Sequence, residues 1–160
     1  MKSLIVYFTM GGRTKRMAKA LADALTKYET TFFPIELTGR LIEKIKQLDK
    51  YEKNDFSAIE NELNSLDAAE FDLIIIGMPT YGDKTPNAFI EILARMKNLK
   101  GKKAIVFSTA RFSGGKARDY MKAKAEEAGA QVIDQTKFRR MFYLGTRMAT
   151  KFGIKINEQY

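Results

Sequence analysis

Residues 9–14 combine two hydroxyl side chains with two adjacent glycines, a composition that can hold a phosphate group. The segment reads Thr9, Met10, Gly11, Gly12, Arg13 and Thr14. It lies between an apolar run typical of a buried strand and the periodic apolar pattern of a helix. The first N–H groups of a helix have no partner within it and carry partial positive charge, so an anion is a natural ligand there. The alternative is a ligand-free strand-to-helix turn with Thr14 near the start of the helix.

The residue types in this loop fit the phosphate interpretation. Glycines let the backbone approach a ligand closely, and the hydroxyls of Thr9 and Thr14 can donate to phosphate oxygens. The spacing excludes two other phosphate-binding loops. A Walker A loop needs Gly-Lys-Thr/Ser after its first glycine, and a dinucleotide fingerprint needs Gly-x-Gly-x-x-Gly. Here Gly11 and Gly12 are followed by Arg13 and Thr14, so neither pattern is present.

Composition restricts the chemistry that the protein can perform. The chain has 160 residues with no Cys and no His. Its length predicts one domain over residues 1–160, large enough for a self-sufficient core. The missing residue types exclude disulfides, Cys/His zinc sites, iron–sulfur ligation and imidazole-dependent catalysis, and we expect no metal. Chemistry must therefore come from a bound cofactor or from carboxylates, hydroxyls and backbone groups.

The chain is strongly basic, with a net charge of +9 and a pI near 9.6. This charge favours an acidic ligand or partner, such as a redox protein, an anionic substrate or a membrane surface. Nucleic acid is an unlikely partner because no recognised binding motif accompanies the charge. The alternative is that the charge serves only solubility. No apolar run approaches ~20 residues and no signal peptide precedes the first strand, so we expect a cytoplasmic protein.

Five apolar runs alternate with helical patterns, which predicts a parallel sheet covered on both faces. The strands are expected at residues 2–8, 30–37, 71–77, 103–108 and 130–136. Pro34 predicts an edge position for the second strand, because proline cannot donate to a ladder. Helices are expected at residues 14–27, from about Pro86, and from Ala117 until Gly129, with Ala128 among the buried side chains.

Two segments are elaborated beyond this simple alternation. Residues 38–70 form a long crossover with two helical patterns, Leu41, Ile42, Ile45 and Leu48, and then Phe56, Ile59, Leu63 and Leu66. Residues 137–160 form a basic C-terminal tail. One helical face is expected there, composed of Phe138, Met141, Phe142, Met148 and Phe152. The tail either closes the sheet or serves as a basic docking arm for an acidic partner.

Two further loops follow strands and should lie beside residues 9–14. Ligands of open parallel sheets bind outside the carboxyl ends of the strands, where the strand order reverses. The loop after the third strand contains Pro79, Thr80, Tyr81, Gly82 and Asp83. The loop after the fourth strand contains Thr109, Ala110, Arg111, Phe112, Ser113 and Gly114.

Taken together, the three loops make residues 1–136 resemble the FMN-binding flavodoxin family. The resemblance implies a three-layer, doubly wound α/β fold with five parallel strands in the order 2-1-3-4-5. It also implies FMN as the cofactor, with residues 9–14 around its phosphate and the loops at 79–83 and 109–114 around the flavin ring. Tyr81 is in the position of the aromatic residue that stacks on the ring; alternatively it closes an edge of the core.

The resemblance implies that the protein carries electrons between partners, for which an acidic redox protein or a reductase is expected. In that family the peptide equivalent to Gly82–Asp83 flips when one electron arrives, although Gly82 could also be an ordinary turn glycine. A second hypothesis is an enzyme of the same fold, of the quinone reductase or protoporphyrinogen oxidase type, acting on an anionic or membrane-borne substrate. A phosphoryl-accepting receiver is discounted, because Thr9, Met78 and Pro79 occupy the positions where it needs carboxylates.

Overall fold

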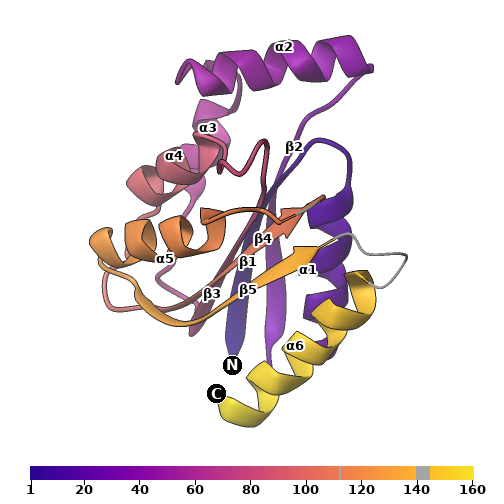
Figure 1. The fold of residues 1–160 in the computed structure, drawn as a ribbon. Coiled ribbons are helices and arrows are strands. Elements are labelled where there is room, and N and C mark those ends of the chain that lie inside the picture. The colour runs from indigo at the N-terminus through magenta and orange to yellow at the C-terminus, as the bar shows by residue number, and fades with distance from the viewer. Residues whose placement is uncertain (112, 140–144) are drawn as a thin grey trace.

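Five parallel strands form one sheet in the order β2-β1-β3-β4-β5, which confirms the predicted order (Figure 1). This computed structural model describes residues 1–111, 113–139 and 145–160. The strands are β1 (Lys2–Thr9), β2 (Glu29–Glu36), β3 (Leu73–Pro79), β4 (Lys103–Ala110) and β5 (Gln131–Arg139). β2 is at an edge, as Pro34 predicted. β1, β3 and β4 are buried almost throughout, because layers of helices cover both of their faces.

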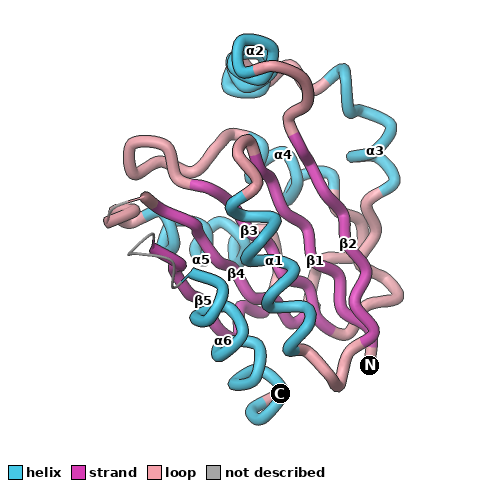
Figure 2. Tube along the Cα trace, turned by 90° about the vertical axis from the view of Figure 1, so that its right-hand side faces the viewer, coloured by secondary structure: helices cyan, strands magenta, loops and turns pink. Residues whose placement is uncertain are grey.

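Helices cover the two faces of the sheet unequally (Figure 2). The helical segments are α1 (Arg13–Ala24), α2 (Leu41–Glu52), the 3₁₀ turn η1 (Ser57–Ile59), α3 (Glu60–Ser65), α4 (Ala88–Arg95), α5 (Ala117–Glu127) and α6 (Gly145–Gln159). One core cluster joins the sheet to α1 and α6, and the other joins its opposite face to α3, α4 and α5. The three-layer α/β arrangement is therefore the expected one. Within the described residues, no helix is both long and apolar enough to cross a membrane.

Three details of the predicted helices are wrong. α1 ends at Ala24 rather than at residue 27, because Leu25 leaves helical geometry with φ −84° and ψ 60°. The second crossover pattern is split into η1 and α3. Ala128 is exposed, because α5 ends at Glu127 and the chain turns at Gly129, whose φ is 92°.

The predicted helical face of the tail is also wrong in part. Phe138 is in β5, where it is buried at 2% exposure, and Met148 is 46% exposed. Met141 and Phe142 lie outside the described residues. Only Phe152 contributes to the buried face of α6 as expected. β5 continues for three residues beyond its predicted end at 136. Phe138 therefore belongs to the sheet and not to the expected helix.

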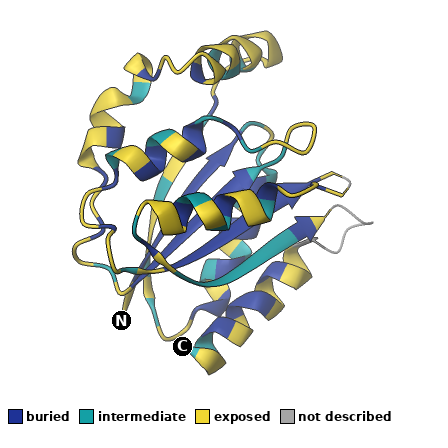
Figure 3. Ribbon diagram, turned by 60° about the vertical axis from the view of Figure 1, so that its left-hand side comes forward, coloured by how far each residue is buried: buried dark blue, intermediate teal, exposed yellow. Residues whose placement is uncertain are grey.

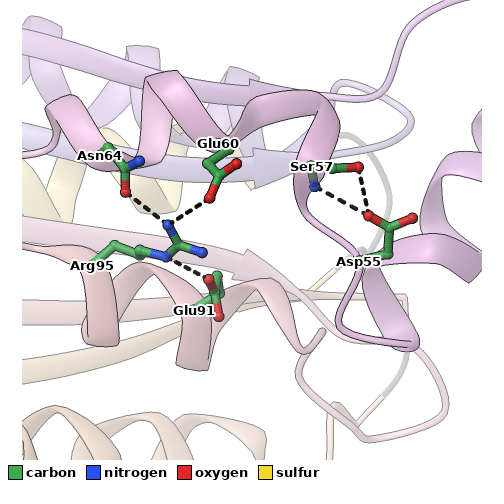
Figure 4. A network of polar contacts seen from close by, with 6 residues as sticks. All are labelled: Asp55, Ser57, Glu60, Asn64, Glu91 and Arg95. Carbon is green, nitrogen blue, oxygen red and sulfur yellow. Dashed lines mark hydrogen bonds and ion pairs between the residues drawn. The ribbon is translucent and has the colours of Figure 1, made fainter.

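The second half of the crossover is held against α4 by Arg95 (Figure 4). Its guanidinium donates to Glu91 of the same helix at 2.7 Å and to Asn64 of α3 at 2.7 Å. Glu60 adds an ion pair at 3.6 Å. Just before, the Asp55 carboxylate accepts hydrogen bonds from the backbone N–H and the hydroxyl of Ser57, which starts η1. These contacts fix residues 55–65, whereas α2 stands beyond the sheet, above the carboxyl ends of the strands (Figure 1).

Candidate functional site

The structure brings the three predicted loops together at the edge of the sheet that is formed by the carboxyl ends of its strands. They follow β1, β3 and β4, which are neighbours in the sheet. The buried polar side chains that the structure describes are Ser3, Thr9, Thr14, Ser108 and Thr109. All but Ser3 lie at this edge, where β1 and β4 end and α1 begins. Because buried polar groups need hydrogen-bond partners, this edge is where the fold tolerates a polar ligand.

The first loop opens directly onto α1. Gly12 has φ 80°, a left-handed conformation that favours glycine, and its N–H donates to Thr9 Oγ1 at 3.0 Å. Hydrogen bonding into the helix begins with Arg16 N–H to Gly12 O at 3.0 Å. A Cβ built at Gly11 or Gly12 would meet nothing within 4 Å. The two glycines therefore leave open space beside the amides of the first helical turn.

Thr109 connects all three loops. Its hydroxyl is 2.9 Å from the hydroxyl of Thr14, and both residues are buried. Its carbonyl accepts from the N–H of Thr80 at 2.9 Å and from the hydroxyl of Thr80 at 3.2 Å. The distance between the first loop and the second loop is thus set by one residue of β4.

These bonds determine which hydroxyl protons could reach a phosphate. Thr9 Oγ1 accepts a hydrogen bond, so its own proton remains available to donate. Thr14 can donate to a ligand only when Thr109 is the donor in the pair that they share. A phosphate would therefore orient this pair so that Thr109 donates to Thr14 and Thr14 donates outward.

The second loop is a tight hairpin that presents Tyr81. Tyr81 N–H donates to Lys84 O at 3.0 Å, and Lys84 N–H returns to Tyr81 O at 3.1 Å. Gly82 and Asp83 between them have φ 55° and 66°, the two positive values of a type I′ turn. Tyr81 is 37% exposed. Burial and the charge of Glu52 raise the pKa of its phenol to about 12, so the ring is neutral near pH 7.

The third loop packs closely on the second. A Cβ at Gly114 would lie 2.7 Å from the Cβ of Ala110, and one at Gly115 would lie 2.7 Å from the Cβ of Asp83. The hydroxyl of Ser113 lies 3.3 Å from Asp83 Oδ1. Glycine is required at 114 and 115 by this packing, in contrast to the open positions 11 and 12.

The remaining predicted site residues are distributed around these contacts. Pro79 ends β3 and is half-buried, Ala110 is buried at the end of β4, and Arg111 is exposed. Arg13 is the first residue of α1, and Met10 is partly buried against the core. Phe112 lies outside the described residues, and with it the prediction of a second aromatic contact.

Sequence reasoning missed the contribution of α2 to this edge. Lys44 Nζ donates to the carbonyl of Met10 at 3.2 Å, and Glu52 accepts from the N–H of Asn87 at 3.0 Å. The signal in the sequence was only that residues 38–70 are longer than a single crossover needs. No local pattern marks a lysine whose partner is 34 positions away.

The residues present at this edge fit FMN. The first turn of α1 and the open glycines suit a phosphate group. The partly exposed and neutral ring of Tyr81 suits stacking on a flat aromatic system. Among the described residues, no cluster of three or more Asp and Glu side chains could hold a metal ion.

Comparisons with known proteins agree with this fit. Residues 1–140 match the model of a family described as NADPH-dependent FMN reductase. No protein of curated function matches the sequence. Among solved structures, oxidised Flavodoxin 2 from Bacillus cereus has a TM-score of 0.65 and 21% identity, with 100% of both chains covered. A flavodoxin from the domain Archaea has a TM-score of 0.62 and 22% identity, with 99% of this chain and 98% of that one covered.

A third structure is that of a Lactobacillus acidophilus flavoprotein in complex with FMN. It has a TM-score of 0.60 and 20% identity, and the alignment covers 85% of this chain and 92% of that one. The solved structures share the fold of this chain, and the family model adds the sequence relationship over seven-eighths of its length. With a five-stranded flavodoxin-like sheet and a family-model match over residues 1–140, the chain belongs to the NADPH-dependent FMN reductase family.

Proposed function

We propose that this protein binds FMN and uses it as an oxidoreductase that takes a hydride from a reduced nicotinamide nucleotide and reduces a second, small substrate. The observation that carries the proposal is the convergence of the open glycine loop, the Thr109 junction and Tyr81 at one edge of the sheet. The family match over residues 1–140 supports both the cofactor and the class of reaction.

The residues of the three loops would divide the binding of FMN between them. The amides of the first turn of α1 and the hydroxyl of Thr9 would hold the phosphate. Tyr81 would lie against the ring system and exclude water from one side of it. Bound FMN supplies the hydride and electron chemistry, while the protein supplies orientation and electrostatics.

The charges around the three loops favour two-electron chemistry. Arg13, Lys84 and Arg111 belong to the first, second and third loop, respectively. Positive charge near a group favours its anionic form, and a fully reduced flavin can carry a negative charge. The same charges suit an anionic substrate, and the overall charge of +9 suits an acidic redox partner.

A second candidate is a one-electron carrier, and the turn at Gly82–Asp83 favours it. Asp83 has φ 66°, a conformation that costs a non-glycine residue free energy. Rotating the Gly82–Asp83 peptide converts a type I′ turn into type II′, in which only Gly82 keeps a positive φ. The flipped turn would thus relieve Asp83, so this loop has two accessible states. The acceptor in that case would be an acidic protein rather than a small molecule.

A fluorescence titration tests the cofactor. Flavin-stripped protein is titrated with FMN and with riboflavin, and Tyr81→Ala is compared with the wild type. Quenching at micromolar or tighter concentrations of FMN, weaker for riboflavin and weaker in the variant, is the expected result. Absence of saturable quenching would overturn the proposal.

Anaerobic reduction separates the two candidate functions. The FMN-loaded protein is mixed with NADPH, and bleaching of the flavin absorption is followed with a quinone as the acceptor. Rapid bleaching and catalytic turnover identify a reductase. A flavin that NADPH cannot reduce without an added reductase identifies a carrier.

A further inference from the structure

Helix α2 is attached to the first loop of the candidate site and to the residue that precedes α4. Near its beginning, Lys44 Nζ donates to Met10 O in the phosphate loop at 3.2 Å. At its end, Glu52 accepts from Asn87, which follows the Tyr81 hairpin. Between them Tyr51 is buried, stacked on Phe56 at 5.1 Å between ring centroids. The position of Lys44 is therefore set by a helix whose C-terminal end is anchored through Tyr51 and Glu52.

Lys44 places a positive charge at the edge of the phosphate loop. Its side chain is half-buried, and the Met10 carbonyl accounts for one of the three N–H bonds of the ammonium group. Lys46, two positions further along the same helix, is exposed. Residues two apart on a helix point in different directions, so Lys46 does not share this site.

The loop has fewer free donors than its sequence indicates. The N–H of Gly12 is already bonded to Thr9, and the hydroxyl of Thr14 can donate to a ligand only when Thr109 donates to it. A phosphate monoester carries nearly two negative charges near pH 7. A cation from outside the loop would offset this charge and add a charge-assisted hydrogen bond, which is stronger than a neutral one.

We propose that Lys44 is a ligand of the FMN phosphate, which makes the crossover helix α2 part of the cofactor site. This inference rests on the proposed FMN binding and adds to it a residue from outside the three loops. On binding, the ammonium group of Lys44 bonds a phosphate oxygen in addition to, or in place of, the carbonyl of Met10. Selectivity for FMN over riboflavin then depends on α2 as well as on residues 9–14.

The test compares FMN and riboflavin binding to flavin-stripped wild type, Lys44→Met, Lys44→Arg and the matched control Lys46→Met. Loss of a charge-assisted hydrogen bond predicts that Lys44→Met weakens FMN binding about 10-fold or more. Riboflavin binding should be unchanged, because riboflavin has no phosphate. Lys44→Arg should retain most of the FMN affinity, and Lys46→Met should bind FMN as the wild type does.

Salt dependence separates charge from a purely structural tether through Met10. If Lys44 contacts the phosphate, FMN affinity falls more steeply with ionic strength in the wild type than in Lys44→Met. Equal slopes, equal losses for FMN and riboflavin, or no effect of Lys44→Met would each overturn the inference. Failure of the wild type to bind FMN would instead overturn the proposed function.

Discussion

Helices α6 and α2 both carry an apolar stripe, but the stripe of α6 is mostly buried whereas most of the stripe of α2 is exposed (Figure 3). Buried in α6 are Ala149 at 0%, Phe152 at 9% and Ile156 at 0% exposure. Exposed in α2 are Leu41 at 66%, Ile42 at 59% and Ile45 at 46%. The same kind of sequence pattern thus closes the sheet in one helix, whereas in the other its first three members are exposed and Leu48 and Tyr51 pack against the core.

Close approach to α1 explains the position of α6. A Cβ at Gly153 would lie 2.7 Å from the Cβ of Ala24 and 2.8 Å from the carbonyl of Leu21. Asn157 donates from its side-chain amide to the carbonyl of Ala24 and so satisfies one of the last carbonyls of α1. Hydrophobic burial and polar pairing therefore act together on α6.

The position of α2 depends on a few separate anchors instead. Tyr51 is its one buried side chain within the described helix, and Lys44 and Glu52 supply polar contacts to the loops below. A helix held in this way has little buried apolar area to lose on moving. The comparison teaches that α6 contributes more than α2 to stability, whereas α2 is suited to respond to what binds at the carboxyl ends of the strands.

The largest effect is expected from Phe152→Ala in α6. The ring of Phe152 contacts that of Phe138 at 6.2 Å, and Phe138 in turn contacts Phe107 at 5.4 Å between centroids. Truncation should lower the free energy of unfolding by about 3–5 kcal/mol. Urea denaturation measures the change, and a loss comparable to that of an exposed residue would contradict the assigned packing.

Gly153→Ala should also destabilise the protein, by about 1–3 kcal/mol through overpacking against α1. Glycine to alanine in an open helix has the opposite sign, because alanine is the better helix former by about 1 kcal/mol. The sign of the change in thermal unfolding is therefore diagnostic. A rise in melting temperature would show that α6 does not approach α1 as closely as described.

A smaller contribution to the attachment of α6 is expected from Lys155 and Asp134, which pair at 2.6 Å. The Asp134 carboxylate raises the pKa of Lys155 above its ordinary value near 10.5. The stabilisation is full below pH 10.5 and is lost as the pH rises through the raised pKa. Lys155 is about half exposed and screened by solvent, so the pair contributes about 0.2–1 kcal/mol. Comparing wild type with Lys155→Met at pH 8 and pH 11 by denaturation should show the difference shrinking at high pH.

The smallest effect is expected in α2. Ile45→Gln replaces an exposed apolar side chain and should change the free energy of unfolding by less than about 0.5 kcal/mol. The same denaturation experiment as for Phe152→Ala gives a direct comparison between the two helices. A loss above about 2 kcal/mol, which is typical of substitutions at buried core positions, would mean that the apolar stripe of α2 is covered.

Much of the candidate site follows from local sequence. Gly11, Gly12 and Thr14 are read from the junction of an apolar run and a helical pattern, and Tyr81 from a loop that follows the most apolar strand. The three loops depend on residues that are adjacent in the chain, so periodicity and spacing contain them. The order of the strands was instead implied by the resemblance to the flavodoxin family, and the structure confirms it.

Contacts between distant residues required the tertiary structure. Thr109 meets Thr14 across 95 positions, and Lys44 meets Met10 across 34, without any local pattern that pairs them. The end of β5 was also missed, because Phe138 fits a helical stripe as well as a strand.

The sequence by itself determined the fold class, the three loops and the amphipathic character of α2, whereas of the face expected for the tail only Phe152 lies on the buried side of α6. Only the tertiary structure decided that α6 is buried against α1, that α2 stands above the carboxyl ends of the strands, and that Lys44 reaches the loop at residues 9–14. The physical reason is that an apolar stripe specifies that a helix needs a partner, whereas the partner is specified by which surfaces the rest of the chain leaves uncovered.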